Sequence, residues 1–108
     1  MRNKVQLIGH LGQAPEIKPL PEGKKLANLN LATNETYKNA KGEKVTDTQW
    51  HHVVAWGKLA EIAEKYLSKG TELAVEGRLV NKQYTDKQGQ KRSSTEIHAS
   101  EMLIITKK

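Results

Sequence analysis

The sequence predicts an all-β fold, mainly strands with one short helix. Several stretches alternate apolar and polar residues with the period of two that is typical of half-buried strands. Only one stretch carries the helical period instead. The 108 residues also leave no room for the crossover helices that a parallel sheet needs. We therefore expect five strands and a helix in a small antiparallel barrel or sandwich.

The first two predicted strands lie near residues 4–9 and 27–31. Val5 and Leu7 alternate with polar neighbours in the first, and Leu29 and Leu31 do so in the second. Turn-rich segments separate the predicted elements, because glycine, proline, asparagine and aspartate favour turns. These segments cover residues 12–25, 39–44 and 85–92.

The third predicted strand, TQWHHVVAWGK at residues 48–58, holds both tryptophans of the chain. Residues an even number of positions apart share a face of a strand, so Trp50 and Trp56 lie on one side and Val53 and Ala55 on the other. Tryptophans are more often core or subunit-contact residues. A small five-stranded core has little room for two indoles, so we assign Val53 and Ala55 to the core and both indoles to the outer face.

The helix is predicted over residues 58–69, and Gly70 stands where a left-handed C-terminal cap belongs. Its expected apolar stripe follows the helical spacing and comprises Leu59, Ile62, Ala63, Tyr66 and Leu67. Two strands follow, near 72–79 and 95–105. The order of three strands, one helix and two strands favours the five-stranded oligonucleotide/oligosaccharide-binding (OB) barrel.

Composition narrows the class of partner. The formal net charge is +6 and the isoelectric point is about 9.6, which favours polyanionic partners. The chain has no cysteine, so disulfides and thiolate sites are excluded. No apolar run has the length of a membrane span, and the start does not follow the pattern of a signal peptide. We expect a cytoplasmic protein with no membrane partner.

Two further aromatics stand beside basic loops. Tyr37 adjoins the loop NAKGEK, and Tyr84 precedes the loop TDKQGQKR. Rings that can stack on unpaired bases, interleaved with cations for the phosphates, are what a single-stranded nucleic-acid groove requires. In the second loop the candidate phosphate contacts are Lys87, Lys91 and Arg92.

Five stretches together resemble the bacterial single-stranded DNA-binding protein family in order and spacing. They are NKVQLIGHLGQAPE, ANLNLATNETY, TQWHHVVAWGKLAEIAEKYLSKG, VEGRL and YTDKQGQKR, and the resemblance covers nearly all of residues 3–105. It implies an OB barrel, sequence-independent binding of single-stranded DNA in replication, recombination and repair, a homotetramer, and a bacterial protein associated with the nucleoid.

The resemblance also assigns residues. Trp50 matches a base-stacking tryptophan, Trp56 a stacking aromatic that is usually phenylalanine, and Tyr37 and Tyr84 fall where tryptophans often stand. His51 lies near the family's subunit contact. Positive charge for the bound strand is implied at Lys58, Lys69, Arg78 and Lys82.

Three departures from the family pattern alter these expectations. Tyrosine in place of tryptophan reduces the stacking area, and His52 and Gln83 stand where the family often has basic residues. Both changes predict weaker, less salt-resistant binding. The family usually continues into an acidic tail, whereas this sequence stops at MLIITKK. We expect one OB domain over residues 1–108 without that tail.

Other functions have weaker support in the sequence. The four histidines lack the spacing of metal ligands, and no nucleophile or phosphate-loop motif is present, so we expect no metal site, no cofactor, no small-molecule substrate and no enzyme activity. Two alternatives remain open. The chain could be an RNA-binding OB module, or a protein-interaction module whose aromatic face is a partner interface.

Overall fold

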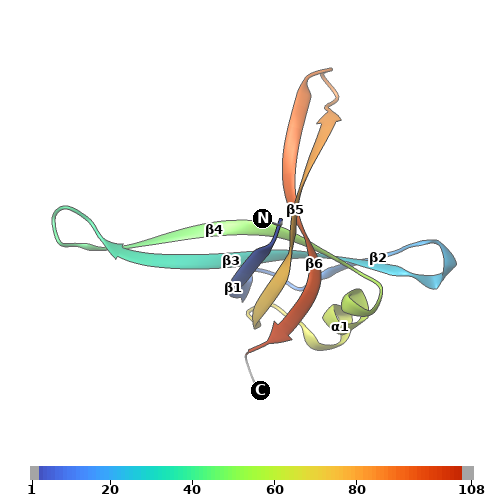
Figure 1. Cartoon of the computed structure of the whole chain (residues 1–108), viewed down its shortest axis with the longest axis horizontal. Helices are drawn as coiled ribbons and strands as arrows, with labels where there is room; N and C mark the ends of the chain where they lie inside the picture. Colours follow the sequence, from blue (N-terminus) through green and yellow to red (C-terminus); the bar gives the residue numbers. More distant parts are fainter. Residues whose placement is uncertain (1–2, 106–108) are drawn as a thin grey trace.

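The computed structural model describes residues 3–105. The prediction about the end of the chain, at residues 106–108, lies outside this range. The described part contains six strands, one short 3₁₀ turn and one α-helix (Figure 1). In chain order they are β1 (Val5–Leu11), β2 (Glu16–Pro19), η1 (Pro21–Gly23), β3 (Lys25–Lys38), β4 (Lys44–Trp56), α1 (Lys58–Tyr66), β5 (Glu72–Thr85) and β6 (Lys91–Ile104).

Five of these strands close into a barrel. The strand order is β1-β5-β6-β4-β3-β2, and β1 also pairs with β3 through His10 opposite Ala32 and Leu11 opposite Leu31. The β4–β6 pair is parallel and the other pairs are antiparallel. This closed five-stranded arrangement confirms the predicted OB barrel.

Closure depends on close backbone approach at Gly9. A Cβ atom at this position would lie 2.2 Å from the carbonyl oxygen of Ala32. Ala32 belongs to β3, whose pairing with β1 closes the barrel. Gly77 has the same role at the β-bulge between β5 and β6, where a Cβ would lie 2.2 Å from the carbonyl oxygen of His98. Both glycines are therefore required by packing between strands.

The prediction of a loop across residues 12–25 was wrong in part, because this segment contains β2. The strand pairs with β3 at the edge of the sheet, outside the closed barrel. Positive φ angles at Glu22 (67°) and Gly23 (75°) turn the chain back into β3. Four residues with one half-buried apolar side chain, Ile17, are too few for an alternation to be recognised.

The core lies inside the barrel and beneath the helix. Val53 and Ala55 have no exposed surface, which confirms their predicted position. The predicted helix stripe was wrong at two positions, since Ile62 is 38% and Tyr66 is 65% exposed. The buried helix face is Ala60 and Ala63, followed by Leu67 just after the helix. Small alanine side chains allow α1 to lie close to the barrel.

The helix also ends earlier than predicted, at Tyr66 instead of residue 69. Leu67 is already extended, and a turn follows in which the Thr71 amide donates to the Ser68 carbonyl at 3.1 Å. The Thr71 hydroxyl accepts a hydrogen bond from the Ser68 amide at 3.0 Å. The positive φ of Gly70 (89°) belongs to this turn and not to a helix cap.

Two long hairpins project from the barrel in different directions (Figure 1). The β3–β4 arm comprises residues 34–48 and the β5–β6 arm residues 80–95, and strand pairing continues to the end of each. Both turns are built alike. The side chain of Asn39 in one, and of Asp86 in the other, accepts hydrogen bonds from two amides of its own turn. These bonds order the tips of the arms.

Candidate nucleic-acid interface

Both indoles lie on the outer face of β4. Trp50 is 62% exposed and Trp56 is 39% exposed, whereas Val53 and Ala55 point into the core. The predicted division of the strand into an aromatic outer face and an aliphatic inner face is therefore confirmed. An exposed indole presents a flat apolar surface to solvent, which is the requirement for stacking on an unpaired base.

Trp50 rests on a glycine. A Cβ atom at Gly12, just after β1, would lie 2.4 Å from Cζ3 and 2.5 Å from Cη2 of the Trp50 ring. The Gly12 amide donates to the carbonyl of Asn30 at 3.0 Å, which fixes the backbone beneath the indole. One side of the ring is thus held against the backbone.

Trp56 is held by His98, a residue that the sequence did not single out. The two rings meet edge to face, with centroids 4.5 Å apart and an interplanar angle of 78°. His98 lies opposite Arg78 in the β5–β6 register and opposite Val54 in the β4–β6 register. Because β4 and β6 are distant in sequence, only their pairing in the barrel reveals this contact.

Three shallow depressions adjoin one another along this face, and we call them together the groove. The first is lined by Gly12, Gln13, Asn30 and Trp50. The second shares Gln13 and Asn30 with the first, and is also lined by Glu16, Lys18, Leu26, Asn28, His52, Val54, Trp56, Lys82 and Glu96. The third begins at Trp56. Trp50 therefore stands at one end of the groove and Trp56 between its second and third parts.

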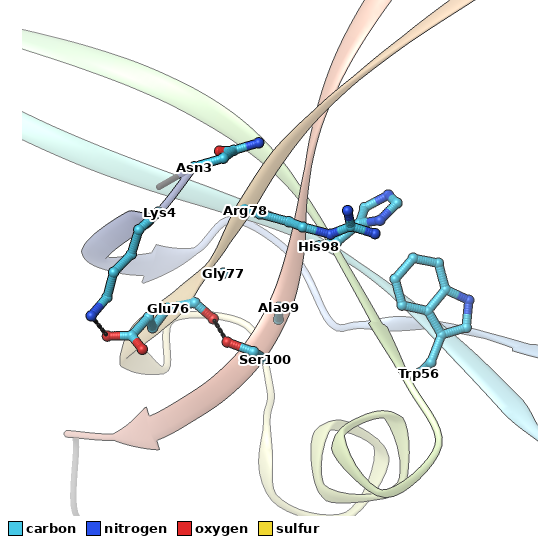
Figure 2. Close-up of a pocket in the computed structure, with 9 residues that line it drawn as sticks. All are labelled: Asn3, Lys4, Trp56, Glu76, Gly77, Arg78, His98, Ala99 and Ser100. Atoms are coloured by element: carbon cyan, nitrogen blue, oxygen red, sulfur yellow. Dashed lines mark hydrogen bonds and ion pairs between the residues drawn. The ribbon is translucent and has the colours of Figure 1, made fainter. Parts of the chain in front are cut away.

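The third depression has a volume of about 560 Å³, and Figure 2 shows its lining residues. Arg78 and His98 lie side by side, with Trp56 beyond the histidine and Asn3 on the opposite side. At the left in this view, Lys4 Nζ lies 3.5 Å from Glu76 Oε1. This end of the groove thus combines an aromatic ring with the guanidinium of Arg78, which has no ion-pair partner among residues 3–105.

The acidic residue Glu96 lies in the second depression and contacts three basic side chains. Its Oε1 is 3.3 Å from Lys82 Nζ and 3.2 Å from His98 Nε2, and its Oε2 is 3.6 Å from His52 Nδ1. Burial favours a higher pKa for this carboxyl, but the hydrogen bonds from His98 and Lys82 and the charges of Lys82 and His52 hold the pKa below its ordinary value. Glu96 is therefore ionised at neutral pH. We call these four residues the Glu96 cluster.

The predicted phosphate-contacting residues fall into three places. Arg78 and Lys82 line the groove. Lys58 starts α1 and Lys69 lies in the turn after it, and both are exposed but outside the lining of the three depressions. The remaining three, Lys87, Lys91 and Arg92, are exposed at the tip of the β5–β6 arm.

Arg92 already has a partner within the chain. Its Nε donates to Asp86 Oδ2 at 3.0 Å. The pKa of Asp86 is lowered chiefly by the hydrogen bond from the Gln90 amide and then by this guanidinium; burial opposes them, and the Gln88 amide adds to the lowering. Arg92 therefore stabilises the turn. Only the N–H groups that are not bonded within the turn can donate to a phosphate.

The two tyrosines predicted to stack on bases lie on the arms and not in the groove. Tyr37 is on the β3–β4 arm and Tyr84 on the β5–β6 arm, each 53% exposed. His51 is half-buried, and its Nε2 lies 2.9 Å from the hydroxyl of Thr33 on β3. His51 is two positions before Val53 in β4, so the two side chains lie on the same face, opposite the indoles.

Neither a metal centre nor a membrane-spanning helix is found within residues 3–105. No three histidine or acidic side chains there are arranged to hold a metal ion. In the Glu96 cluster, the carboxylate that two histidines approach already forms an ion pair with the ammonium group of Lys82. The one α-helix of the described residues is too short to cross a bilayer.

The barrel, its outer aromatic groove and its two hairpin arms define the OB-fold class of binding modules. A family model described as "Single-strand binding protein family" matches residues 2–105. The chain belongs to this family.

Individual relatives agree with this membership. The chain is 44% identical over 104 residues to Single-stranded DNA-binding protein 1 of Chlorobaculum tepidum, covering 95% of this chain and 64% of that protein's length. A Plasmodium falciparum SSB solved in complex with ssDNA aligns with a TM-score of 0.89 and 32% identity, over 98% of this chain and 96% of the other. A deletion mutant of the single-stranded DNA-binding protein from Thermus aquaticus aligns with a TM-score of 0.82 and 31% identity, over 97% and 51%.

Proposed function

We propose that this chain binds single-stranded DNA without sequence specificity. The observation that carries the proposal is the groove of adjoining depressions in which Trp50 and Trp56 present exposed indoles beside Arg78 and Lys82. Every base has a π-face, so stacking on these rings tolerates any sequence, and the cations neutralise the phosphates. The Plasmodium falciparum relative, which shares the fold over nearly the whole chain, was solved with ssDNA.

The two arms extend the binding surface beyond the groove. Tyr37 and Tyr84 supply additional stacking surfaces, and Lys87 and Lys91 additional positive charge. Lys58 and Lys69, near the ends of α1, serve a strand that continues past Trp56. The bound strand thus passes along the barrel and contacts the arms.

The cellular role follows from binding alone. A protein that covers unpaired bases protects exposed strands in replication, recombination and repair, and such strands occur at the bacterial nucleoid in the cytoplasm. The residues of the groove are suited to stacking and charge neutralisation, so we assign the chain no enzymatic reaction.

We also propose that the protein acts as a homotetramer. Ile8 on β1 lies opposite Ala74 on β5, which lies opposite Leu103 on β6. Ile8 is 62% and Leu103 67% exposed, and together they form an apolar row on the outside of the barrel. Such a row favours association between protein surfaces. His51, on the face away from the indoles, lies near a second subunit contact.

Binding is tested with fluorescently labelled oligo-dT, whose anisotropy is measured in low salt beside duplex DNA and oligo-U of the same length. We expect tight binding to oligo-dT and much weaker binding to the duplex. Tighter binding to oligo-U would favour an RNA-binding module instead. No binding to any of the three would favour a protein-interaction module.

The assembly is tested separately by light scattering. A monomer at micromolar concentration would contradict the tetramer and leave the DNA-binding proposal standing. A tetramer that is disrupted by Leu103→Glu would support the apolar row as one of its contacts.

A further inference from the structure

The tips of the two arms have the same turn, anchored by a different side chain in each. In the β3–β4 arm, Asn39 Oδ1 accepts hydrogen bonds from the amides two and four residues later, at 2.9 and 3.0 Å. In the β5–β6 arm, Asp86 Oδ1 accepts the two corresponding bonds, each at 2.9 Å. A glycine with positive φ follows three residues after each anchor, 79° at Gly42 and 80° at Gly89. One side-chain oxygen therefore forms the turn, and an amide provides it as well as a carboxylate.

The second carboxylate oxygen of Asp86 has a different partner. Oδ2 accepts a hydrogen bond from Arg92 Nε at 3.0 Å, and Arg92 Nη2 donates to Oε1 of Gln90 at 3.4 Å. The Nε–Nη2 edge of a guanidinium is one of the edges that can bind a phosphate through two parallel hydrogen bonds. Here this edge faces the turn. Asp86 thus occupies the position that a phosphate oxygen would take.

The corresponding positions of the other arm carry no such pair. Arg92 follows its anchor by six positions, and Val45 follows Asn39 by six. In the strand registers Arg92 lies opposite Tyr84, and Val45 lies opposite Tyr37. Residues directly opposite each other share a face of the strand pair, so each lies beside an exposed tyrosine. The carboxylate anchor therefore occurs in the arm that has a guanidinium beside its tyrosine, and the amide anchor in the arm that has an apolar residue there.

We propose, on the basis of the strand-binding function above, that Asp86 acts as an internal substitute for a phosphate and withholds Arg92 from the bound strand. Lys87 and Lys91 are exposed and form no ion pair within residues 3–105. These two lysines are the cations of this tip that contact phosphates. Arg92 fixes the turn and adds no phosphate contact. The Asp86 carboxylate thereby limits the affinity of the arm for single strands.

The proposal fixes the number of phosphate contacts in the variant Asp86→Asn. Its Oδ1 still accepts the two turn amides, whereas the Nδ2 group that replaces Oδ2 is a donor and cannot bond to Arg92 Nε. Arg92 is then released beside Tyr84. Each phosphate neutralised on a single strand contributes about 0.7 to the slope of log affinity against log salt. We expect the slope to steepen by about 0.7, and affinity in low salt to rise by about threefold, the scale of one exposed ion pair.

The experiment measures the anisotropy of labelled oligo-dT with the full chain over a range of salt concentrations. The decisive variant is Asp86→Asn/Arg92→Gln, which removes the pair and conserves the net charge. It should bind with the slope of the wild type, because it loses no phosphate contact. If Arg92 contacts a phosphate in the wild type, the slope of this variant will instead flatten by about 0.7. That result would overturn the proposal.

The matched control is Glu43→Gln in the turn of the other arm. It removes one negative charge from a side chain that has no ion-pair partner in the described part of the chain, so it releases no cation. Its slope should stay close to that of the wild type. A steepening as large as that of Asp86→Asn would reveal a general effect of charge and contradict the proposal.

The other arm also allows the test without a change at Asp86. Val45→Arg places a guanidinium six positions after Asn39, whose amide cannot neutralise it, and should steepen the slope by about 0.7. Adding Asn39→Asp should cancel this gain. A gain that survives in Asn39→Asp/Val45→Arg would refute the proposal, even if Asp86→Asn fails to fold. These outcomes concern this inference alone, whereas absence of oligo-dT binding by the wild type would overturn the strand-binding function as well.

Discussion

The glycine beneath Trp50 offers a way to perturb the stacking face without removing a ring. In Gly12→Ala, the new Cβ would lie 2.4 Å from Cζ3 and 2.5 Å from Cη2 of the indole. Carbon atoms in favourable contact are about 3.5 to 4.0 Å apart, so the ring must move outward by at least about 1 Å. The backbone of Gly12 does not have a positive φ, and alanine can adopt it.

The displacement should weaken binding more than it weakens the fold. Stacking of one base on an aromatic contributes about 1 to 3 kcal/mol, and a displaced ring should lose roughly 1 kcal/mol of it, which is about fivefold in Kd. Trp50 is 62% exposed, so its displacement costs little packing. We expect the free energy of unfolding to change by less than about 1 kcal/mol, because the lower entropy of an unfolded chain with alanine offsets part of the loss.

The assay is a double-mutant cycle. Anisotropy of labelled oligo-dT gives the Kd of the wild type, Gly12→Ala, Trp50→Ala and the double variant, and urea unfolding followed by circular dichroism gives their stabilities. If the methyl group acts through the indole, Gly12→Ala should change Kd by less than about twofold in the Trp50→Ala background. An equal loss of affinity in both backgrounds would refute this reasoning.

Four further changes test the remaining parts of the structure. Trp56→Ala should weaken oligo-dT binding by about tenfold or more and destabilise the fold more than Trp50→Ala, because Trp56 is less exposed and contacts His98; parallel binding and urea curves measure both. Lys91→Ala should flatten the slope of log affinity against log salt by about 0.7 without changing base preference. Gly77→Ala should lower thermal stability strongly, since its Cβ would meet backbone. The lowered pKa of Asp86 contributes stability above its unfolded pKa, and this contribution is lost as the pH falls through the folded pKa; Asp86→Asn should therefore show a smaller loss in acid melts.

The face of each long strand could be predicted from sequence because alternation is a local property. In β4 the assignment of Val53 to the core and of Trp50 to the outer surface needed only the period of two and the size of an indole. The barrel class also followed from the order of the elements in so short a chain.

The helix shows where local pattern was insufficient. Ile62 and Tyr66 have the spacing of a buried stripe, yet the barrel meets the face that carries Ala60 and Ala63. Which face packs depends on how closely the backbones approach, and alanine permits the closer approach. The edge strand β2 was missed because its pairing with β3, and not its own pattern, orders it.

The sequence alone determined the aromatic and basic character of the binding face. The indoles, tyrosines, lysines and arginines can be read from the sequence, and alternation along each strand assigns them to one of its two faces. Only the tertiary structure decided which of them meet. Glu96 contacts Lys82 from β5, His52 from β4 and His98 from its own strand. Trp56 contacts His98 across the parallel β4–β6 pair. Alternation fixes the side of a strand on which a residue lies, but the register between strands distant in sequence is set by closure of the barrel, and so are the contacts that tune each charge.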